Sequence, residues 1–465
     1  QMKQGGILAY LAYWSFFFFL PSQCIADVSP LLPQAPKGSA YFVDGDRCSM
    51  LFGSNPTGWN TDQVFALLDQ AQRDGERIVR IHLTNGMFPS GRAGALDMEW
   101  VGKWESIFDE AARRGLAVIP VFDVWAWWNV AGSGGTQNWG ANPYNSKNGG
   151  PGGRPEALLE DGPTQRLFMA WLEALVRRWA PRKEILLWEP FSEINLLSGA
   201  TEAGAVDFLR ASAAVIRRAD PLGRPVTIPL AGPQAWPAFF GSPALDLIEI
   251  HPYAENPPYN GNLDLEILDL VRSQLRFRKP VLIGESGLDS RPPSHAPAGD
   301  AWRRGLEQAL WAEVVSGSTT GRMLWWEDGY DQYTSVNLRT SCAGLSLPMV
   351  AFVKGVDYRG FRPIELSDLS GIQGAALGSS SHFLLWVRDR RCEAPDWPLR
   401  DIQKASARLQ VGGGHWVVDF YHTNDGKAFM RKQLFAGQDG LKMDLPPFSG
   451  SIAAKGYWLG AATAH

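Results

Sequence analysis

The chain has 465 residues and a formal net charge of -4, and 45% of its residues are hydrophobic. This length predicts a large domain followed by a smaller module, and the slight negative charge excludes a basic surface for nucleic acid. The 20 tryptophans favour a carbohydrate ligand, because an indole ring can stack on the C–H face of a sugar. For any single Trp the alternative is a place in the core.

The N-terminal segment has the pattern of a secretory signal peptide. Lys3 precedes an apolar run over residues 7–20, and small residues follow it. We predict a signal peptide over residues 1–26 and a linker over residues 27–39. An uncleaved anchor is the alternative, although the run is short for a membrane span, and a lipoprotein signal at Cys24 is a weaker one. The expected product is secreted or periplasmic, without membrane contact after cleavage.

Cleavage would leave three cysteines, Cys48, Cys342 and Cys392. Their odd number and wide spacing predict neither a disulfide framework nor a metal site, although a single bridge stays open. The sequence also lacks a phosphate loop and a dinucleotide fingerprint. We therefore expect neither a cofactor nor a metal. We also expect the protein to be a monomer.

Strand-like and helix-like segments alternate after the linker. Helical patterns include residues 63–73, 164–179, 203–218, 263–276 and 301–316. Eight short apolar runs are typical of strands: residues 50–53, 78–83, 116–122, 185–189, 225–229, 247–250, 280–284 and 322–326. The alternation predicts a (β/α)8 barrel, of the α/β class, over residues 40–356. In such barrels the site lies at the C-terminal ends of the strands.

The pattern changes after residue 356. Short β-type runs such as "HFLLWVRD" and "HWVVDFYH" are separated by Gly, Asp and Asn turns, and long helical patterns stop. We predict a small antiparallel β-sandwich over residues 357–465, which covers barrel helices or, alternatively, binds sugar. A Gly- and Asn-rich stretch over residues 132–155 follows the third strand and should lie on the active face.

Polar and aromatic residues gather where the predicted strands end. Cleavage of a glycosidic bond needs one carboxyl group to protonate the leaving oxygen and a second on the other side of the sugar. Acids, an Arg, His, Tyr and several Trp therefore suggest a sugar site. The candidates are Arg80, His82, Asp123, Trp125, Trp127, Trp128, Glu189, Glu193, His251, Tyr253, Glu285, Trp325 and Trp326.

Five motifs resemble clan A of the glycoside hydrolases, which includes family 5 cellulases and mannanases. "LLWEPFSEIN" is similar to the fourth-strand pattern W-E-x-x-N-E, and "PVLIGESGLD" to the seventh-strand pattern. This resemblance implies that Glu193 is the acid/base and Glu285 the nucleophile. Glu189 is then a structural partner of a positive or hydrogen-bonding neighbour, and its role as the functional acid is the alternative.

The other three motifs resemble the second, sixth and eighth strands of the clan, and the resemblance covers residues 40–345. "IVRIHL" implies that Arg80 supports the nucleophile, with His82 beside it. "IEIHPY" implies hydrogen bonds from His251 and Tyr253 to the nucleophile or the substrate. "MLWWEDGY" implies that Trp325 or Trp326 forms the floor of the subsite for the cleaved sugar, and Trp125, Trp127 and Trp128 are expected to bind sugar as well.

Ser192 departs from the clan pattern, which usually has Asn before the acid/base to hold the sugar 2-hydroxyl. The departure favours a substrate with an axial or modified 2-position, such as mannose. We predict a secreted retaining β-glycoside hydrolase, endo-acting rather than exo-acting, whose partner is a β-mannan or β-glucan type polysaccharide or oligosaccharide. The alternatives are a non-catalytic carbohydrate-binding barrel in exopolysaccharide handling and a transglycosylase with the same two glutamates.

Overall fold

The structure is a computed structural model that describes residues 32–36, 38–56, 61–84, 91–132, 137–232, 236–289, 299–325 and 342–460. The predicted signal peptide over residues 1–26 and Trp326 lie outside these ranges. Among the helices of the described ranges, none combines the length and the apolar character that a bilayer span requires.

Two parallel sheets form the centre of the α/β region. In the first, the strand order is β5 (Ala117–Val121), β4 (Ile78–His82), β3 (Leu51–Ser54) and β9 (Thr320–Gly321). In the second it is β6 (Leu230–Ala231), β7 (Ile248–His251) and β8 (Val281–Ile283). Every residue of β4, β5, β7 and β8 is buried, as expected for parallel strands covered on both faces.

Isolated parallel bridges extend the two sheets toward each other. Val121 pairs with Glu189 and Trp188 pairs with Val226, so the predicted strands at 185–189 and 225–229 lie in strand positions without regular ladders. On the other side, Ser286 pairs with Leu324. The mixed α/β class predicted from the sequence is thus confirmed. A closed ring of eight regular strands is not seen as one continuous sheet, and that finer point stays a prediction.

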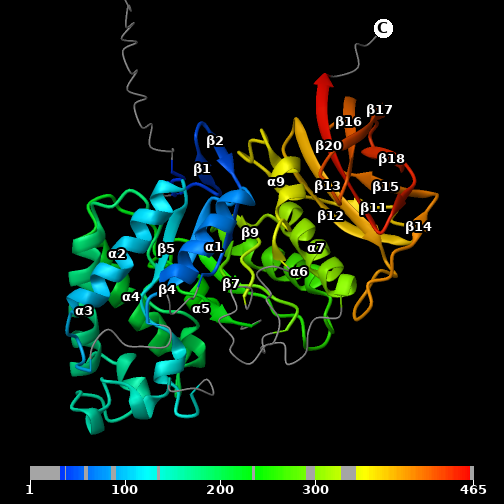
Figure 1. Ribbon diagram of the computed structural model, residues 1–465. Coiled ribbons are helices and arrows are strands. Elements are labelled where there is room, and N and C mark those ends of the chain that lie inside the picture. The colour runs from blue at the N-terminus through cyan, green and yellow to red at the C-terminus, as the bar shows by residue number, and fades with distance from the viewer. Residues whose placement is uncertain are drawn as a thin grey trace, which may run out of the picture.

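Helices cover these strands (Figure 1). They are α1 (Thr61–Arg73), α2 (Met98–Arg113), α3 (Pro163–Trp179), α4 (Glu202–Ala219), α5 (Pro237–Phe240), α6 (Leu263–Gln274), α7 (Gly299–Ser316) and α9 (Leu347–Val353). In α2 the buried residues recur at helical spacing, from Trp100 through Trp104 to Phe108 and Ala111. Asp97 begins this helix, because its carboxylate accepts hydrogen bonds from the backbone N–H groups of Glu99 and Trp100.

The Gly- and Asn-rich segment after β5 forms a lobe of short 3-10 turns, at the lower left of Figure 1. The turns are Trp125–Trp128, Trp139–Ala141, Ser146–Asn148 and Pro155–Leu158. Asparagine amides hold them to one another: Asn142 Nδ2 donates to the Trp127 carbonyl and Asn145 Nδ2 to the Trp139 carbonyl, both at 2.9 Å. These bonds satisfy backbone groups that no ladder pairs, which explains the many asparagines.

The C-terminal region is rich in antiparallel strands, as predicted. A six-stranded sheet has the order β10 (Arg362–Ile364), β12 (Ile372–Gly378), β13 (His382–Asp389), β20 (Ser451–Gly460), β16 (Gly414–His422) and β17 (Ala428–Ala436). A smaller sheet contains β11 (Leu366–Ser367), β15 (Ala405–Leu409) and β18 (Leu441–Leu445). Their shared core includes Phe383, Leu385, Trp416, Val418, Phe420 and Met443. A short pair in the same region joins β14 (Asp401–Ile402) to β19 (Phe448–Ser449). Near the N-terminus of the described chain, β1 (Phe42–Asp44) pairs with β2 (Arg47–Ser49).

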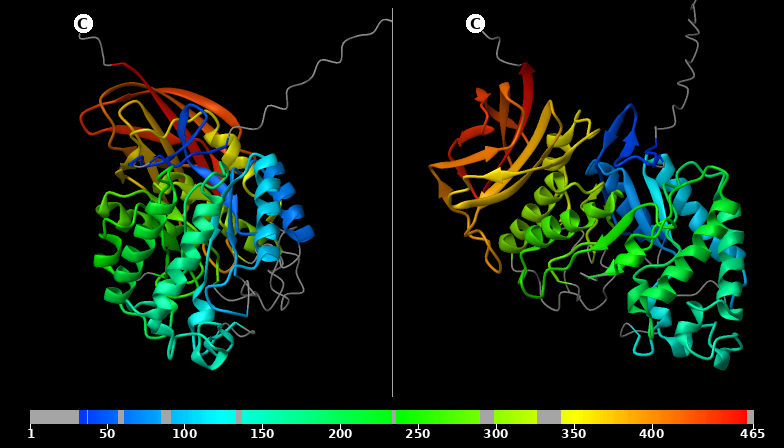
Figure 2. Two further views of the ribbon diagram at one scale, coloured as in Figure 1. Left: turned by 90° about the vertical axis from the view of Figure 1, so that its left-hand side faces the viewer. Right: turned by 180° about the vertical axis from the view of Figure 1, so that it is seen from behind.

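The six-stranded sheet packs against helices of the α/β region (Figure 2). Arg388 on β13 donates from Nε to Asp264 Oδ2 of α6 at 2.6 Å, and both side chains are buried. Trp311 of α7 donates from its indole N–H to the Thr423 carbonyl at 3.0 Å. The boundary between residues 356 and 357 stays a prediction, and charged and aromatic contacts join the two regions.

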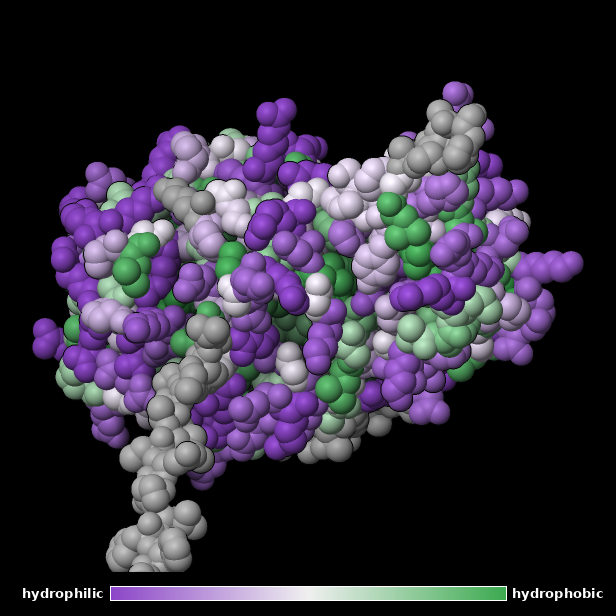
Figure 3. Space-filling model, turned by 90° about the horizontal axis from the view of Figure 1, so that it is seen from above, coloured by the Kyte–Doolittle hydropathy of each residue, from purple (hydrophilic) through white to green (hydrophobic). Residues whose placement is uncertain are grey.

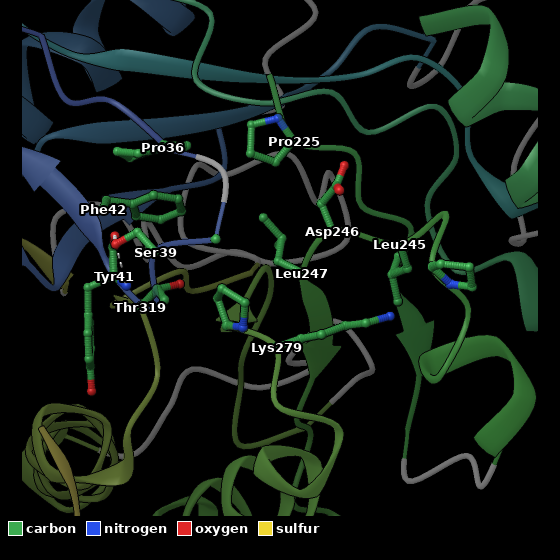
Figure 4. Close-up of a pocket in the computed structure, with 14 residues that line it drawn as sticks. Pro36, Ser39, Tyr41, Phe42, Pro225, Leu245, Asp246, Leu247, Lys279 and Thr319 are labelled. Carbon is green, nitrogen blue, oxygen red and sulfur yellow. Dashed lines mark hydrogen bonds between the residues drawn. The ribbon is translucent and has the colours of Figure 1, made fainter. Parts of the chain in front are cut away.

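A cavity lies at the N-terminal side of β7, β8 and β9 (Figure 4). Its lining includes the charged residues Lys279 and Asp246. Lys279 Nζ donates to the carbonyls of Phe240 and Ser242, and Asp246 accepts from the backbone N–H of Val226. These charges hold the chain itself, and the cavity lies at the opposite strand ends from the candidate glutamates. Seen from above, the molecule is mostly hydrophilic, with scattered hydrophobic side chains (Figure 3).

Candidate active site

The C-terminal ends of the parallel strands bring the predicted polar residues together. Arg80 and His82 alternate on β4, so they share one face, and His251 ends β7. Glu285 follows β8 by two residues, and a parallel bridge between Val124 and Ser192 sets the backbone before Glu193. The assembled candidates are Arg80, His82, Ser192, Glu193, His251, Tyr253 and Glu285.

The two candidate catalytic acids face each other across a short gap. One carboxylate oxygen of Glu193, one of Glu285 and a ring nitrogen of His251 all lie within 4.8 Å of one another. His251 Nδ1 lies 2.8 Å from Glu193 Oε1 and 3.6 Å from Glu285 Oε2. Both glutamates are buried, with 9% of Glu193 and 5% of Glu285 exposed. The carboxyl groups of Glu193 and Glu285 therefore lie close enough to act on the same bound sugar.

Glu285 is surrounded by donors. Arg80 Nη1 donates to Oε1 at 2.7 Å, and the Tyr253 hydroxyl donates to Oε2 at 2.9 Å. Burial alone would raise the pKa of Glu285, but the positive charges of His251 and Arg80 outweigh it and lower this pKa to about 2. Glu285 is therefore ionised at neutral pH, and burial keeps the pKa of Tyr253 well above its usual value, so its hydroxyl remains a donor.

Arg80 is the central cation of the site and is fully buried. Its Nε and Nη2 donate to the two oxygens of Glu189 at 2.7 and 2.6 Å, a bidentate pair. Its Nη2 also donates to Ser192 Oγ at 2.9 Å, and Nε lies 3.0 Å from Glu249 Oε1. Burial would lower the pKa of Arg80, but the surrounding carboxylates hold it well above its usual value.

Glu189 lies deeper than the two candidate catalytic acids. Its side chain is fully buried and bound to Arg80 through both oxygens. Burial raises its pKa to about 8, and the guanidinium of Arg80 opposes this. Because it has no exposed surface, it does not reach a substrate in this structure.

The two histidines differ in charge. Burial would lower the pKa of His251, but Glu285, Glu193 and Glu249 raise it to about 10, so the ring is an imidazolium. Burial and the charge of Arg80 hold the pKa of His82 well below its usual value, so this ring is neutral. His82 packs against the half-buried Trp325, with ring centroids 5.0 Å apart.

The backbone at Glu193 is strained. This residue has φ 56° and ψ 52°, the left-handed region that a side chain other than Gly or Asn seldom adopts. Such a conformation costs about 1–2 kcal/mol, and strained residues cluster at functional sites. In this conformation a carboxylate oxygen of Glu193 lies 2.8 Å from Nδ1 of His251.

Several predicted substrate contacts need correction. Trp128 is fully buried and stacks on Trp139 with centroids 5.5 Å apart, while its indole N–H donates to Asp123. It therefore belongs to the core of the lobe and has no free face for a sugar. Trp127 is 5% exposed and donates to the Thr84 carbonyl, which gives it a mainly structural role, whereas Trp125 is half-buried.

Arg80, Ser192 and His251 are also too buried to contact a substrate directly. Their exposed fractions are 0%, 2% and 0%, respectively, and each contacts an acid or the central Arg instead. Arg80 donates to Glu285 and His251 contacts Glu193, while the hydroxyl of Ser192, expected at the sugar 2-position, accepts from Arg80. Trp326, the other candidate for the subsite floor, lies outside the described residues.

Sequence reasoning missed two members of the site. Glu249 precedes His251 by two residues in "IEIHPY", and this alternation was a usable signal that both side chains point the same way. Asn55 directly follows β3 and accepts from Arg80 Nη1 at 3.1 Å, while its amide donates to the carbonyls of Gly284 and Met323. The strand-end rule applied to β3 would have found it.

Solved structures resemble this chain, although no family model and no curated protein matches its sequence. A glycoside hydrolase aligns over 93% of this chain and 98% of its own, with a TM-score of 0.63 and 13% identity. A family 5 glycoside hydrolase from Bacteroides vulgatus covers 93% and 96%, with a TM-score of 0.63 and 14% identity. An endo-1,4-β-mannanase from Rhizomucor miehei covers 68% and 98%, with a TM-score of 0.52 and 14% identity.

The fold is therefore a family 5-like glycoside hydrolase fold, which agrees with the clan resemblance of the motifs. The first two alignments extend over most of the chain, so the β-rich region is part of the shared architecture.

Proposed function

We propose that this protein is a retaining β-glycoside hydrolase. The observation that carries the proposal is the close approach of two glutamates with unequal surroundings. Retaining enzymes hold their carboxyl groups about 5–5.5 Å apart, and inverting enzymes about 6.5–9.5 Å apart. The oxygens of Glu193 and Glu285 that lie within 4.8 Å of each other favour the shorter class.

The surroundings assign the roles. Glu285 is held ionised by Arg80 and His251, as a nucleophile requires, and its Oε2 attacks the anomeric carbon. Glu193 gives its proton to the leaving oxygen in the same step. In the second step Glu193 takes a proton from water, and the water oxygen displaces Glu285 from the anomeric carbon.

The test is the configuration of the first-formed product. We expect proton NMR of a β-glycoside digest to show the β-anomer before mutarotation. We also expect Glu285→Gln to abolish turnover while the exposed-surface variant Glu160→Gln keeps it. A first-formed α-anomer, or equal activity in the Glu285→Gln variant and the wild type, contradicts the proposal.

We also propose a β-mannan or β-glucan type polysaccharide as substrate, with endo action. Support comes from the Ser192 position, from the lobe after β5, and from the likeness in fold to an endo-1,4-β-mannanase. Product sizing over a panel of polysaccharides tests both points. Export from the cytoplasm is proposed from the N-terminal sequence alone, and N-terminal sequencing of the mature protein tests it.

A further inference from the structure

Glu249 is a fully buried acid beneath the proposed catalytic pair. It precedes His251 by two residues on β7, so both side chains leave the same face of the strand. Within the described residues, neither of its carboxylate oxygens has a hydrogen-bond partner. A buried carboxylate is costly unless cations compensate it, so its presence here needs a cause.

Two cations compensate this acid. Glu249 Oε1 lies 3.0 Å from Arg80 Nε and 3.7 Å from His251 Nε2. Glu285 makes the matching pair of contacts, with Arg80 Nη1 at 2.7 Å and His251 Nδ1 at 3.6 Å. The two acids thus flank the same two cations. Glu285 retains some exposure and Glu249 has none.

The chain also makes room for Glu249. A Cβ atom at position 284 would lie 1.8 Å from Glu249 Oε1, so any residue other than glycine there would force the Glu249 side chain to shift. The glycine of "PVLIGESG" therefore leaves space for the glutamate of "IEIHPY", on the neighbouring strand. One sequence motif leaves the space that the other fills.

We propose that Glu249 is a positioning residue, which orients the His251 ring and supplies it with a counter-charge that stays constant through the reaction. The inference rests on the proposed function. When the glycosyl ester forms, Glu285 loses its negative charge and Glu193, having given up its proton, gains one. His251 Nδ1 faces both of these acids, whereas Nε2 faces Glu249, which exchanges no proton and forms no bond.

The charged and titratable groups around the His251 ring come from several elements. They are Arg80 and His82 on β4, Glu189 and Glu193 on the segment after α3, Glu249 and Tyr253 on or after β7, and Glu285 after β8. Glu249 is the acid that faces Nε2 of His251, and it takes no part in bond making.

The test is an NMR titration of the His251 ring, assigned by comparison with His251→Asn. In the wild type we expect the ring to stay protonated from about pH 5 to about pH 9. In Glu249→Gln the midpoint should fall by about one unit or more, because a negative neighbour is lost. Glu189→Gln is the matched control: it removes a buried acid that binds Arg80 directly, and should shift the midpoint much less.

Kinetics give a second readout. In Glu249→Gln we expect kcat to decline at a lower pH than in the wild type while KM changes little, and Glu249→Asp, which keeps the charge, should restore the profile. An unchanged His251 midpoint in Glu249→Gln overturns the inference. If that variant does not fold, an ordinary imidazole midpoint in the wild type overturns it instead. The expected titration without any hydrolysis would reject the proposed function and leave the His251 arrangement intact.

Discussion

Nδ1 of His251 lies 2.8 Å from Oε1 of Glu193. The ring is fully buried, so it holds this carboxyl group from the interior of the protein and leaves the second oxygen for chemistry. The unusual backbone at Glu193 directs the side chain to the same place. A proton donor fixed in this way should matter most when the leaving group needs a proton.

Replacing Glu193 with Gln tests this role. We expect kcat/KM to fall by about 10²–10⁴ on a natural glycan, the range for loss of a general acid. On an aryl glycoside whose leaving group departs without a proton, the loss in the first step should be far smaller. Steady-state kinetics on the two substrates, with Glu160→Gln as control, decide the matter, and equal losses on both would contradict the assignment.

The acid limit of stability should depend on Glu285. Its folded pKa of about 2 lies below its ordinary value of 4.5, so its ionisation stabilises the fold above about pH 4.5. This contribution is lost as the pH falls from about 4.5 toward about 2. Urea unfolding at several pH values should therefore show a smaller loss in Glu285→Gln than in the wild type. Parallel curves for the two proteins would refute the depressed pKa.

Arg80 cannot be replaced by Lys without loss, because an ammonium group cannot reach Glu189 and Glu285 with the same fork of donors. We expect Arg80→Lys to reduce the free energy of unfolding by about 3–5 kcal/mol, as for a broken buried pair. The acid limb of kcat/KM should also move to higher pH, because the pKa of Glu285 rises. A wild-type acid limb in a folded Arg80→Lys variant would show that Arg80 does not set this pKa.

Ser192→Asn tests whether this position selects the sugar. Ser192 Oγ accepts from Arg80 Nη2, and a longer amide at this site would extend toward the 2-hydroxyl contact that the clan resemblance implies. We expect the ratio of kcat/KM for matched β-glucosides and β-mannosides to move toward glucosides by about tenfold. Similar changes on both substrates would remove Ser192 as a determinant of selectivity.

The buried ion pair between Arg388 and Asp264 should couple the unfolding of the α/β region to that of the β-rich region. We expect Asp264→Asn to cost about 3–5 kcal/mol, because it leaves a buried guanidinium without its anion. The control is Asp419→Asn, whose partner Arg431 is 70% exposed, and its cost should be at most about 1 kcal/mol. Calorimetric unfolding compares them, and equal costs would contradict a special role for the buried pair.

Much of the site was predictable because it follows strand ends. Alternation on β4 places Arg80 with His82, which follows directly from the period of a strand, and His251 ends β7. The same rule also identifies Glu249, but only if a buried acid is accepted on an interior strand of the sheet. The sequence does not show which cation neutralises such an acid, because Arg80 lies far from Glu249 along the chain.

Other features depend on three-dimensional packing that a pattern does not carry. "WAWW" alone does not say which indole is exposed; in the structure Trp128 is covered by Trp139 and Tyr144 of its own lobe. The strand expected at 185–189 forms isolated bridges instead of a regular ladder. Cys48 and Cys392 are buried and do not form a disulfide with each other.

The contacts of Arg80 have a consequence for how the molecule reaches its native state. One guanidinium on β4 neutralises acids delivered by three other segments of the chain. An intermediate in which only some of those segments have docked would bury carboxylates facing one another without their cation. We expect such an intermediate to be poorly populated, so the segments that carry these acids should dock around Arg80 together rather than one at a time.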